Sequence, residues 1–268
     1  MRAREPDHAG HVERDGVRIG YEVFGEGERT ILLMPTWAII PSGFWKGQVP
    51  QLARRHRVIT FDARGSGRSD RPGDAAQCGH FDNVDDAIAV LDEVGGERAL
   101  VVATTHGACN ALALASLYPE RVAGLLAFGP CMPALTPPFE HRTVHDFETD
   151  YGIDEGWARE NRYSWARDYR GFLEFFFGEV FPEPHSTKQI EDCVAWGVDI
   201  GREMLQRTWD GPEFVSSREH AEQLLRDIRC PVLVVQGTED RIAPGERFER
   251  VAELTGARLV VFEGAGHN

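Results

Sequence analysis

Thr105, Asp240 and His267 are the residues of this sequence whose types and order could support acyl transfer. This chemistry needs a nucleophile, a base that takes its proton, a group that orients the base, and N–H donors for the developing oxyanion. A hydroxyl, an imidazole and a carboxylate can meet the first three needs. The three residues lie far apart in the sequence, so the fold has to bring them together.

The residues around Thr105 have the pattern of a nucleophile elbow, which is a sharp turn between a strand and a helix. The segment ATTHG, residues 103–107, follows an apolar run and precedes an alanine-rich run with helical spacing. Small residues are needed two positions on either side of the nucleophile, because the turn forces close backbone contact there. Thr105 meets this requirement, with Ala103 before it and Gly107 after it. We therefore expect Thr105 at the tip of the turn.

Threonine at this position is a departure, since serine is the residue expected at such a turn. β-Branched side chains tolerate a strained backbone poorly, and a secondary hydroxyl should attack more slowly than a primary one. Thr105 could therefore have a structural role only. The strain would then serve no function, which favours a catalytic role. Cys109, one helical turn later, is expected to be a packing cysteine and not a displaced nucleophile.

The candidate acid and the candidate base each follow a short apolar run that is typical of a buried strand. Asp240 lies in the loop after the run 232–236, and Glu239 is the alternative acid. His267 follows the run 259–262, and an ordinary loop histidine is the alternative interpretation. Because the carboxyl ends of parallel strands meet at the same edge of a sheet, we expect these side chains to lie near the elbow.

Apolar runs and helical patterns alternate along most of the chain. We expect strands at 17–24, 30–34, 58–61, 99–103, 122–128, 232–236 and 259–262. We expect helices at 46–54, 84–94, 108–117 and 246–254. This alternation predicts an α/β fold with a mainly parallel sheet and helices on both faces. The alternation breaks at 134–218, so we expect a core formed by 1–133 and 219–268 and an inserted helical lid.

Aromatic residues are concentrated in the predicted insertion. Their spacing by four predicts one face of an amphipathic helix that carries Trp157, Asn161, Trp165, Tyr169 and Leu173. Plain packing of this face onto the core is one interpretation, and the lining of an apolar substrate pocket is the other. On the second interpretation, we expect the pocket to be lined by Trp37, Trp165, Tyr169, Phe172 and Phe176.

Two further segments resemble parts of a known family. The segment DARGSGRSD at 62–70 resembles the turn after the fourth strand of α/β-hydrolases, and YPERV at 118–122 resembles the segment that follows their elbow helix. Together with the elbow and the order nucleophile, acid, histidine, they make the chain similar to this family from about residue 11 to its end. The resemblance implies an eight-stranded sheet. We expect Asp62 and Arg64 to brace the turn rather than to touch substrate.

The resemblance also implies a role for individual residues. By position, Thr105 would be the nucleophile, Asp240 the acid and His267 the base. The backbone N–H groups of His106 and Trp37 would hold the oxyanion. In the loop before Trp37, the family usually has His-Gly, whereas this chain has Pro35 and Thr36.

The composition limits the partners and the location. The net charge of −14 argues against nucleic acid, because phosphate binding needs a basic face. The five cysteines are widely spaced and form no C-x-x-C pair, which argues against a disulfide framework and a structural zinc site. No phosphate-cradling loop or metal cluster is visible, so we expect no cofactor and no metal. Because no signal peptide or membrane-length apolar run is visible, we expect a cytoplasmic enzyme with a small-molecule substrate and no membrane partner.

The function that these observations favour is hydrolysis of a small, largely apolar ester or related acyl compound by a Thr-His-Asp variant of the α/β-hydrolase triad. One alternative is a non-hydrolytic enzyme, a lyase or isomerase, in which the His-Asp pair acts only as a general base. The other alternative is a catalytically silent sensor that closes on a small molecule. The presence of both His267 and Asp240 argues against the sensor, whereas Thr105 argues for it.

Overall fold

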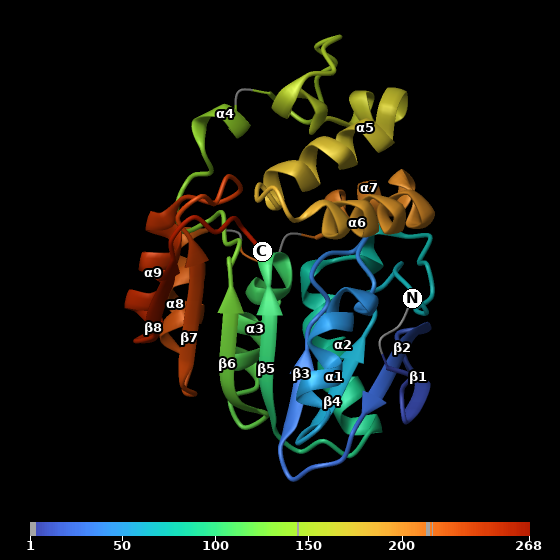
Figure 1. Cartoon of the computed structure of the whole chain (residues 1–268), viewed down its shortest axis with the longest axis vertical. Coiled ribbons are helices and arrows are strands. Elements are labelled where there is room, and N and C mark those ends of the chain that lie inside the picture. Colours follow the sequence, from blue (N-terminus) through green and yellow to red (C-terminus); the bar gives the residue numbers. More distant parts are fainter. Residues whose placement is uncertain (1–3, 144, 213–214, 216) are drawn as a thin grey trace.

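An eight-stranded sheet forms the centre of the structure (Figure 1), a computed structural model that describes residues 4–143, 145–212, 215 and 217–268. The remaining residues, which fall in the predicted core and insertion, lie outside this description. The strand order is β1-β2-β4-β3-β5-β6-β7-β8. The strands are β1 (His8–Arg14), β2 (Val17–Phe24), β3 (Thr30–Leu33), β4 (Arg57–Phe61), β5 (Ala99–Thr104), β6 (Val122–Phe128), β7 (Val232–Gly237) and β8 (Arg258–Phe262).

The predicted mainly parallel sheet is confirmed. Only β1 with β2 and β2 with β4 pair in antiparallel fashion, and the pairs from β4 through β3 to β8 are parallel. The strand His8–Arg14 was not among the strands expected from the sequence. It is an edge strand whose residues are exposed or half-buried, so its sequence lacks the apolar run of a strand that is buried on both faces.

Helices cover both faces of the sheet. The α-helices are α1 (Val49–Leu52), α2 (His80–Glu93), α3 (Thr105–Leu117), α4 (Glu140–Thr143), α5 (Arg162–Val180), α6 (Thr187–Ile200), α7 (Arg202–Trp209), α8 (Arg218–Arg226) and α9 (Gly245–Thr255). Short 3₁₀ helices lie at Ser42–Gly47, Ala75–Gln77 and Gly156–Arg159. Helices α2, α3, α8 and α9 pack in a row over one face, and α1 covers part of the other. The expected helix at 46–54 is wrong as a single element, because it is split into a 3₁₀ turn and α1.

The two faces of β3 show how the sequence builds both cores. Leu32 and Met34 pack with α2 and α3 in the larger cluster, whereas Ile31 and Leu33 pack with α1 on the opposite face. All four side chains are at most 5% exposed. A strand that is covered on both faces reads as a continuous apolar run, which is why the parallel strands were recognisable in the sequence.

Helices α4 to α7, which lie between β6 and β7, extend across the carboxyl ends of the strands (Figure 1). The single helix expected from the spacing of four is wrong. Trp157 lies in a 3₁₀ helix, and Asn161 is the N-cap of α5, where its Oδ1 accepts a hydrogen bond of 2.9 Å from the N–H of Tyr163. Inside α5, Asp168 has φ −148° and ψ 73°, which is a kink. No helix in the described part of the chain is long and apolar enough to cross a membrane.

The turn after β4 is braced by buried charge, as expected. Asp62 accepts hydrogen bonds from the N–H of Ser42 at 2.6 Å and from the N–H of Arg68 at 2.9 Å. Arg64 donates two bonds to Asp86, at 2.8 and 3.0 Å. Gly67 has φ +49°, and a Cβ there would lie 2.3 Å from the carboxylate of Asp62, so only glycine fits.

Candidate active site

Thr105 lies at a sharp turn where β5 ends and α3 begins. Its φ is +54°, in the left-handed region that a β-branched residue rarely adopts. Such a conformation costs on the order of 1–3 kcal/mol and persists only where the surroundings enforce it. The close contact at Gly107 is one such constraint, because a Cβ there would lie 2.2 Å from the carbonyl oxygen of Pro35. The backbone therefore turns at the residue that the small neighbours indicated.

The hydroxyl of Thr105 is directed toward the loop after β3. Its Oγ1 donates to the carbonyl oxygen of Thr36 at 3.1 Å, and the N–H of Gly107 donates to the same oxygen at 3.1 Å. Thr105 is only 9% exposed. Proton transfer to a base elsewhere would therefore require the hydroxyl to leave this carbonyl.

Asp240 and His267 form a buried pair at the same edge of the sheet. Nδ1 of His267 lies 2.7 Å from Oδ2 of Asp240, and the two side chains are 1% and 4% exposed. The other carboxylate oxygen accepts hydrogen bonds from the N–H groups of Ile242 at 2.8 Å and Ala243 at 2.9 Å. Since the carboxylate is an acceptor, the proton of the neutral imidazole is assigned to Nδ1, which leaves Nε2 free to act as a base. Glu239, the alternative acid, is exposed.

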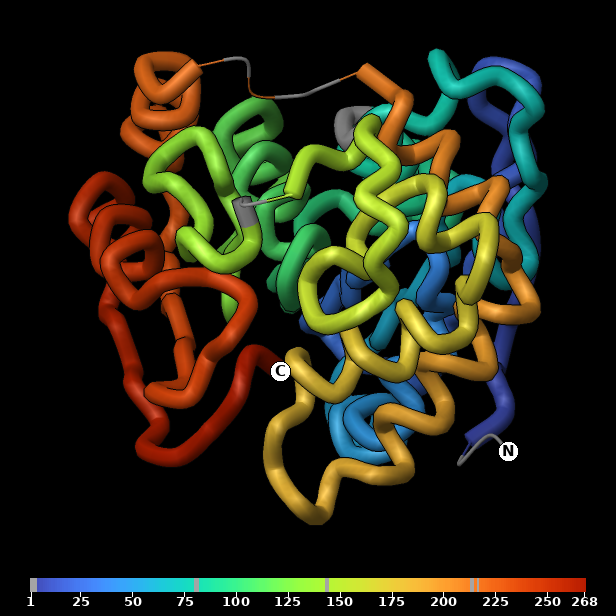
Figure 2. The backbone as a smooth tube through the Cα atoms, turned by 90° about the horizontal axis from the view of Figure 1, so that it is seen from above, coloured from blue at the N-terminus to red at the C-terminus, as the bar shows by residue number. Residues whose placement is uncertain are grey.

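The loop that carries His267 is held by the end of α5 and the residues after it. The N–H of His267 donates to the carbonyl oxygen of Val180 at 3.2 Å, and the N–H of Gly266 donates to Oε1 of Glu183 at 2.6 Å. Figure 2 shows the end of the chain beside this gold segment. The helical segment above the sheet thus fixes the position of the candidate base.

Nε2 of His267 lies 3.6 Å from Sγ of Cys131, a residue that follows β6. Burial lowers the pKa of His267, but the neighbouring Cys131 and Asp240 outweigh burial and raise it to about 10. Burial raises the pKa of Asp240, but the charge of His267 and the hydrogen bonds to the carboxylate outweigh it and hold the pKa below its usual range. Both shifts in pKa favour the charged imidazolium–carboxylate pair over the neutral pair, so a rise in pH favours the neutral, basic form of His267.

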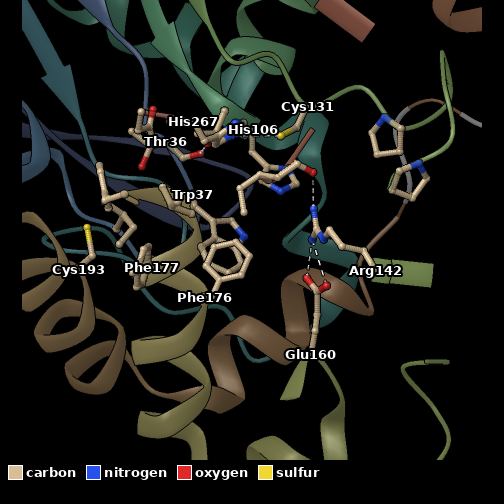
Figure 3. Close-up of a pocket in the computed structure, with 18 of the residues that line it drawn as sticks. Thr36, Trp37, His106, Cys131, Arg142, Glu160, Phe176, Phe177, Cys193 and His267 are labelled. Atoms are coloured by element: carbon tan, nitrogen blue, oxygen red, sulfur yellow. Dashed lines mark hydrogen bonds and ion pairs between the residues drawn. The ribbon is translucent and has the colours of Figure 1, made fainter. Parts of the chain in front are cut away.

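A cavity of about 310 Å³ lies beside the candidate base (Figure 3). Thr105 and His267 lie in its wall, together with an apolar side that includes Trp37, Phe176 and Phe177. The rings of Trp37 and Phe176 are 5.0 Å apart. The cavity has the size and the mostly apolar lining of a small-molecule site.

Three of the five residues expected in the pocket do not line it. Trp37 and Phe176 do, but Trp165, Tyr169 and Phe172 do not. Trp165 and Phe172 are 2% and 0% exposed and pack against each other at 4.9 Å. The ring of Tyr169 lies 6.3 Å from the rings of both, so these three side chains pack against one another within the helical segment instead of lining the cavity.

The expected oxyanion residues also border the cavity. The rings of Trp37 and His106 are stacked, with centroids 6.1 Å apart and an angle of 10° between their planes. His106 directly follows Thr105, and Trp37 directly follows the carbonyl that accepts the Thr105 hydroxyl bond. The use of their backbone N–H groups as an oxyanion hole stays a prediction.

Several polar residues of the cavity wall were not found from the sequence. Among them are Cys131, Arg142, Glu160 and Arg247. The sequence contained a signal for Arg247, because this arginine lies on the buried face of α9. Phe248, Val251 and Ala252 are the other buried residues of this helix. The other three are brought together only by contacts between distant segments. Among the described residues, no group of three His, Cys, Asp or Glu side chains could hold a metal ion.

Comparison with known proteins agrees with this geometry. A family model for the alpha/beta hydrolase fold matches residues 29–268. A 2-hydroxymuconate semialdehyde hydrolase from Pseudomonas sp. (strain CF600) is 32% identical over 96% of this chain and 90% of its own length. A non-heme haloperoxidase from Rhodococcus erythropolis is 28% identical over 94% of this chain and 90% of its own length.

A similar solved structure is that of the N-acyl homoserine lactone degrading enzyme Est816. It is 25% identical, covers 96% of this chain and 93% of its own, and superposes with a TM-score of 0.76. The relatives that are named as hydrolases support hydrolase activity. The sheet order, the turn at Thr105 and these matches together lead to one conclusion: the chain is an enzyme that belongs to the α/β-hydrolase fold family.

Proposed function

We propose that this enzyme hydrolyses a small, largely apolar ester or related acyl compound, with Thr105 as nucleophile, His267 as base and Asp240 as the group that orients the base. The observation that carries the proposal is the bond of 2.7 Å between Asp240 and His267 at a cavity that Thr105 also lines. The names of two similar proteins, a semialdehyde hydrolase and a lactone-degrading enzyme, support a carbonyl substrate.

The reaction would take place in two steps. The hydroxyl of Thr105 turns from the carbonyl of Thr36 to Nε2 of His267, which costs about one hydrogen bond, or roughly 1 kcal/mol. The resulting alkoxide attacks the substrate carbonyl while the N–H groups of Trp37 and His106 stabilise the oxyanion. The imidazolium then protonates the leaving alcohol. Water, deprotonated by the same imidazole, releases the acid and restores the hydroxyl.

Cys131 is the rival nucleophile for the same function. Its Sγ lies 3.6 Å from Nε2 of His267, whereas the hydroxyl of Thr105 donates to a backbone carbonyl. A thiol beside an imidazole is a known way to activate a nucleophile. Against this role, Thr105 and not Cys131 has the strained backbone of an elbow.

A second candidate function is general-base catalysis without a covalent step, as in a lyase or isomerase. The bond from the Thr105 hydroxyl to Thr36 favours it, because a hydroxyl held in this way could position a substrate without attacking it. The insertion at 134–218 would act as a lid in either function, since its described helices lie across the site.

Release of p-nitrophenol from short- and medium-chain acyl esters tests the proposal. Wild type is compared with Thr105→Ser, Thr105→Ala and His267→Ala, and Thr104→Ser serves as a neighbouring control that retains a hydroxyl. We expect turnover by wild type, loss of turnover in both alanine variants and little change in the control. An inert wild type with an active Thr105→Ser variant would contradict ester hydrolysis as the native function.

A further inference from the structure

One end of the cavity carries two arginines but a single carboxylate. Arg142 is already neutralised, because it donates to both oxygens of Glu160 at 2.9 and 3.1 Å (Figure 3). It also donates to the carbonyl oxygen of Ile242 at 2.8 Å, and its guanidinium lies 4.4 Å from the ring centre of Trp157. Arg142 and Glu160 therefore contribute no net charge to the cavity.

Arg247 is buried without such compensation. It is 2% exposed, and its two hydrogen bonds go to the neutral side-chain and backbone oxygens of Thr136, each at 3.0 Å. In the described part of the chain, no carboxylate lies within ion-pair distance of it. A guanidinium has five N–H donors and stays charged in a protein, so donors that Thr136 does not use remain available at the cavity.

A buried charge without a partner is costly, and in native proteins it is normally paired. Burial is the largest effect and lowers the pKa of Arg247, and the nearby charge of Arg142 also lowers it, whereas Cys131, Cys109 and Asp240 raise it. Burial of the positive charge of Arg247 therefore costs free energy. An anion in the cavity would relieve it, and the planar fork of a guanidinium matches a carboxylate.

Much of the remaining wall of the cavity is apolar. Phe44, Phe176, Phe177 and Val180 line it, and the reacting residues Thr105 and His267 line the same cavity. The cavity therefore presents a cationic end and an apolar side around one reactive centre.

We propose that Arg247 binds a carboxylate of the substrate, so that the site accepts an amphipathic acyl compound with an anionic group at one end and an apolar group at the other. The location of the reacting bond rests on the proposed function, but the binding of the anion does not. A role limited to holding Thr136 is the alternative, and it predicts no preference between charged and neutral ligands.

Isothermal titration with a matched pair of ligands tests this proposal. The pair is 4-phenylbutyrate and its neutral amide, 4-phenylbutyramide, which share the apolar group and contain no ester. At pH 7, we expect wild type to bind the carboxylate roughly tenfold or more tightly than the amide. Arg247→Met should bring the ratio of the two dissociation constants to about one, and Arg247→Lys should restore part of it.

Arg241→Met is the matched control, because Arg241 is half exposed and pairs with Glu179 at 3.5 Å. It should keep the wild-type ratio. The ratio within one variant does not depend on how much of the protein is folded, so a destabilised Arg247→Met remains informative. The wild-type ratio is a test that needs no variant.

Three results would overturn the proposal. They are equal binding or no binding of the carboxylate by wild type, a preference that survives Arg247→Met, and a preference that only Arg142→Gln removes. Because binding is measured without turnover, an enzyme that fails to hydrolyse esters would still give a clear result here. Failure of the proposed function and failure of the anion site are therefore distinguishable.

Discussion

Replacement of Asp240 by asparagine separates orientation of the base from integrity of the loop. In Asp240→Asn, the retained amide oxygen still accepts from the N–H groups of Ile242 and Ala243, which are 2.8 and 2.9 Å away in the wild type. The new amide NH₂ faces Nδ1 of His267, where the carboxylate oxygen was 2.7 Å away. Because an amide NH₂ donates, Nδ1 must accept and the imidazole proton must move to Nε2. His267 then cannot take a proton from the nucleophile.

The expected size of the effect follows from this change of tautomer. An equivalent change in a Ser-His-Asp triad lowers kcat about 10⁴-fold, which is roughly 5 kcal/mol of activation free energy. We expect a loss of about 10³- to 10⁴-fold in Asp240→Asn with little loss of stability. Asp240→Ala also leaves two buried N–H groups without an acceptor, so it should be less stable than the asparagine variant by about 2 kcal/mol or more.

The assay combines p-nitrophenyl ester turnover with urea unfolding of the same preparations. Glu239→Gln is the matched control, because Glu239 is the exposed neighbouring carboxylate and should not affect turnover. An Asp240→Asn variant that keeps more than roughly a tenth of the wild-type kcat/KM would refute the role of the carboxylate.

Four further outcomes are expected. Burial lowers the pKa of His267, but Cys131 and Asp240 raise it to about 10, so kcat/KM should rise toward pH 10, and Cys131→Ala should shift the midpoint of the profile of kcat/KM against pH downward. The same raised pKa gives the folded state extra stability that is fully present below pH 6.5 and is lost as the pH rises through 10. The free energies of unfolding of wild type and His267→Gln, measured in urea, should therefore converge at alkaline pH. Gly107→Ala should cost about 1–3 kcal/mol or more, because its Cβ would lie 2.2 Å from a backbone oxygen; an unchanged urea midpoint would contradict the elbow contact. Phe177→Ala should raise KM, whereas Trp165→Ala should cost about 3–5 kcal/mol and leave KM unchanged, since only Phe177 lines the cavity.

The parallel strands and the turn were predictable because their residues carry strong local constraints. A strand covered on both faces must be apolar throughout, as in β3 and β5, and the elbow needs small residues at fixed positions. β1 was missed because it lacks the constraint that makes a buried strand apolar throughout. Its sequence, HAGHVER, belongs to an edge strand that buries little, so the apolar signal was absent.

The residues that line the pocket were less predictable, because the lining depends on how distant segments pack together. The aromatic spacing in α5 correctly indicated buried side chains, but which of them reaches the cavity depends on the distant segments that pack against each ring. Periodicity therefore could not tell Phe176, which lines the cavity, from Phe172, which does not. Cys131 meets His267 across 136 positions in the sequence, and no local pattern encodes such a contact.

The proposed function depends first on Thr105 as the nucleophile. Its most direct test is intact-mass and peptide-mass analysis of enzyme that is acid-quenched during turnover of a p-nitrophenyl ester, with His267→Ala as the control that should form no adduct. We expect an acyl group on the peptide that contains Thr105 and its absence in Thr105→Ala. An acyl group on Cys131, or undiminished turnover by Thr105→Ala, would contradict this role of Thr105.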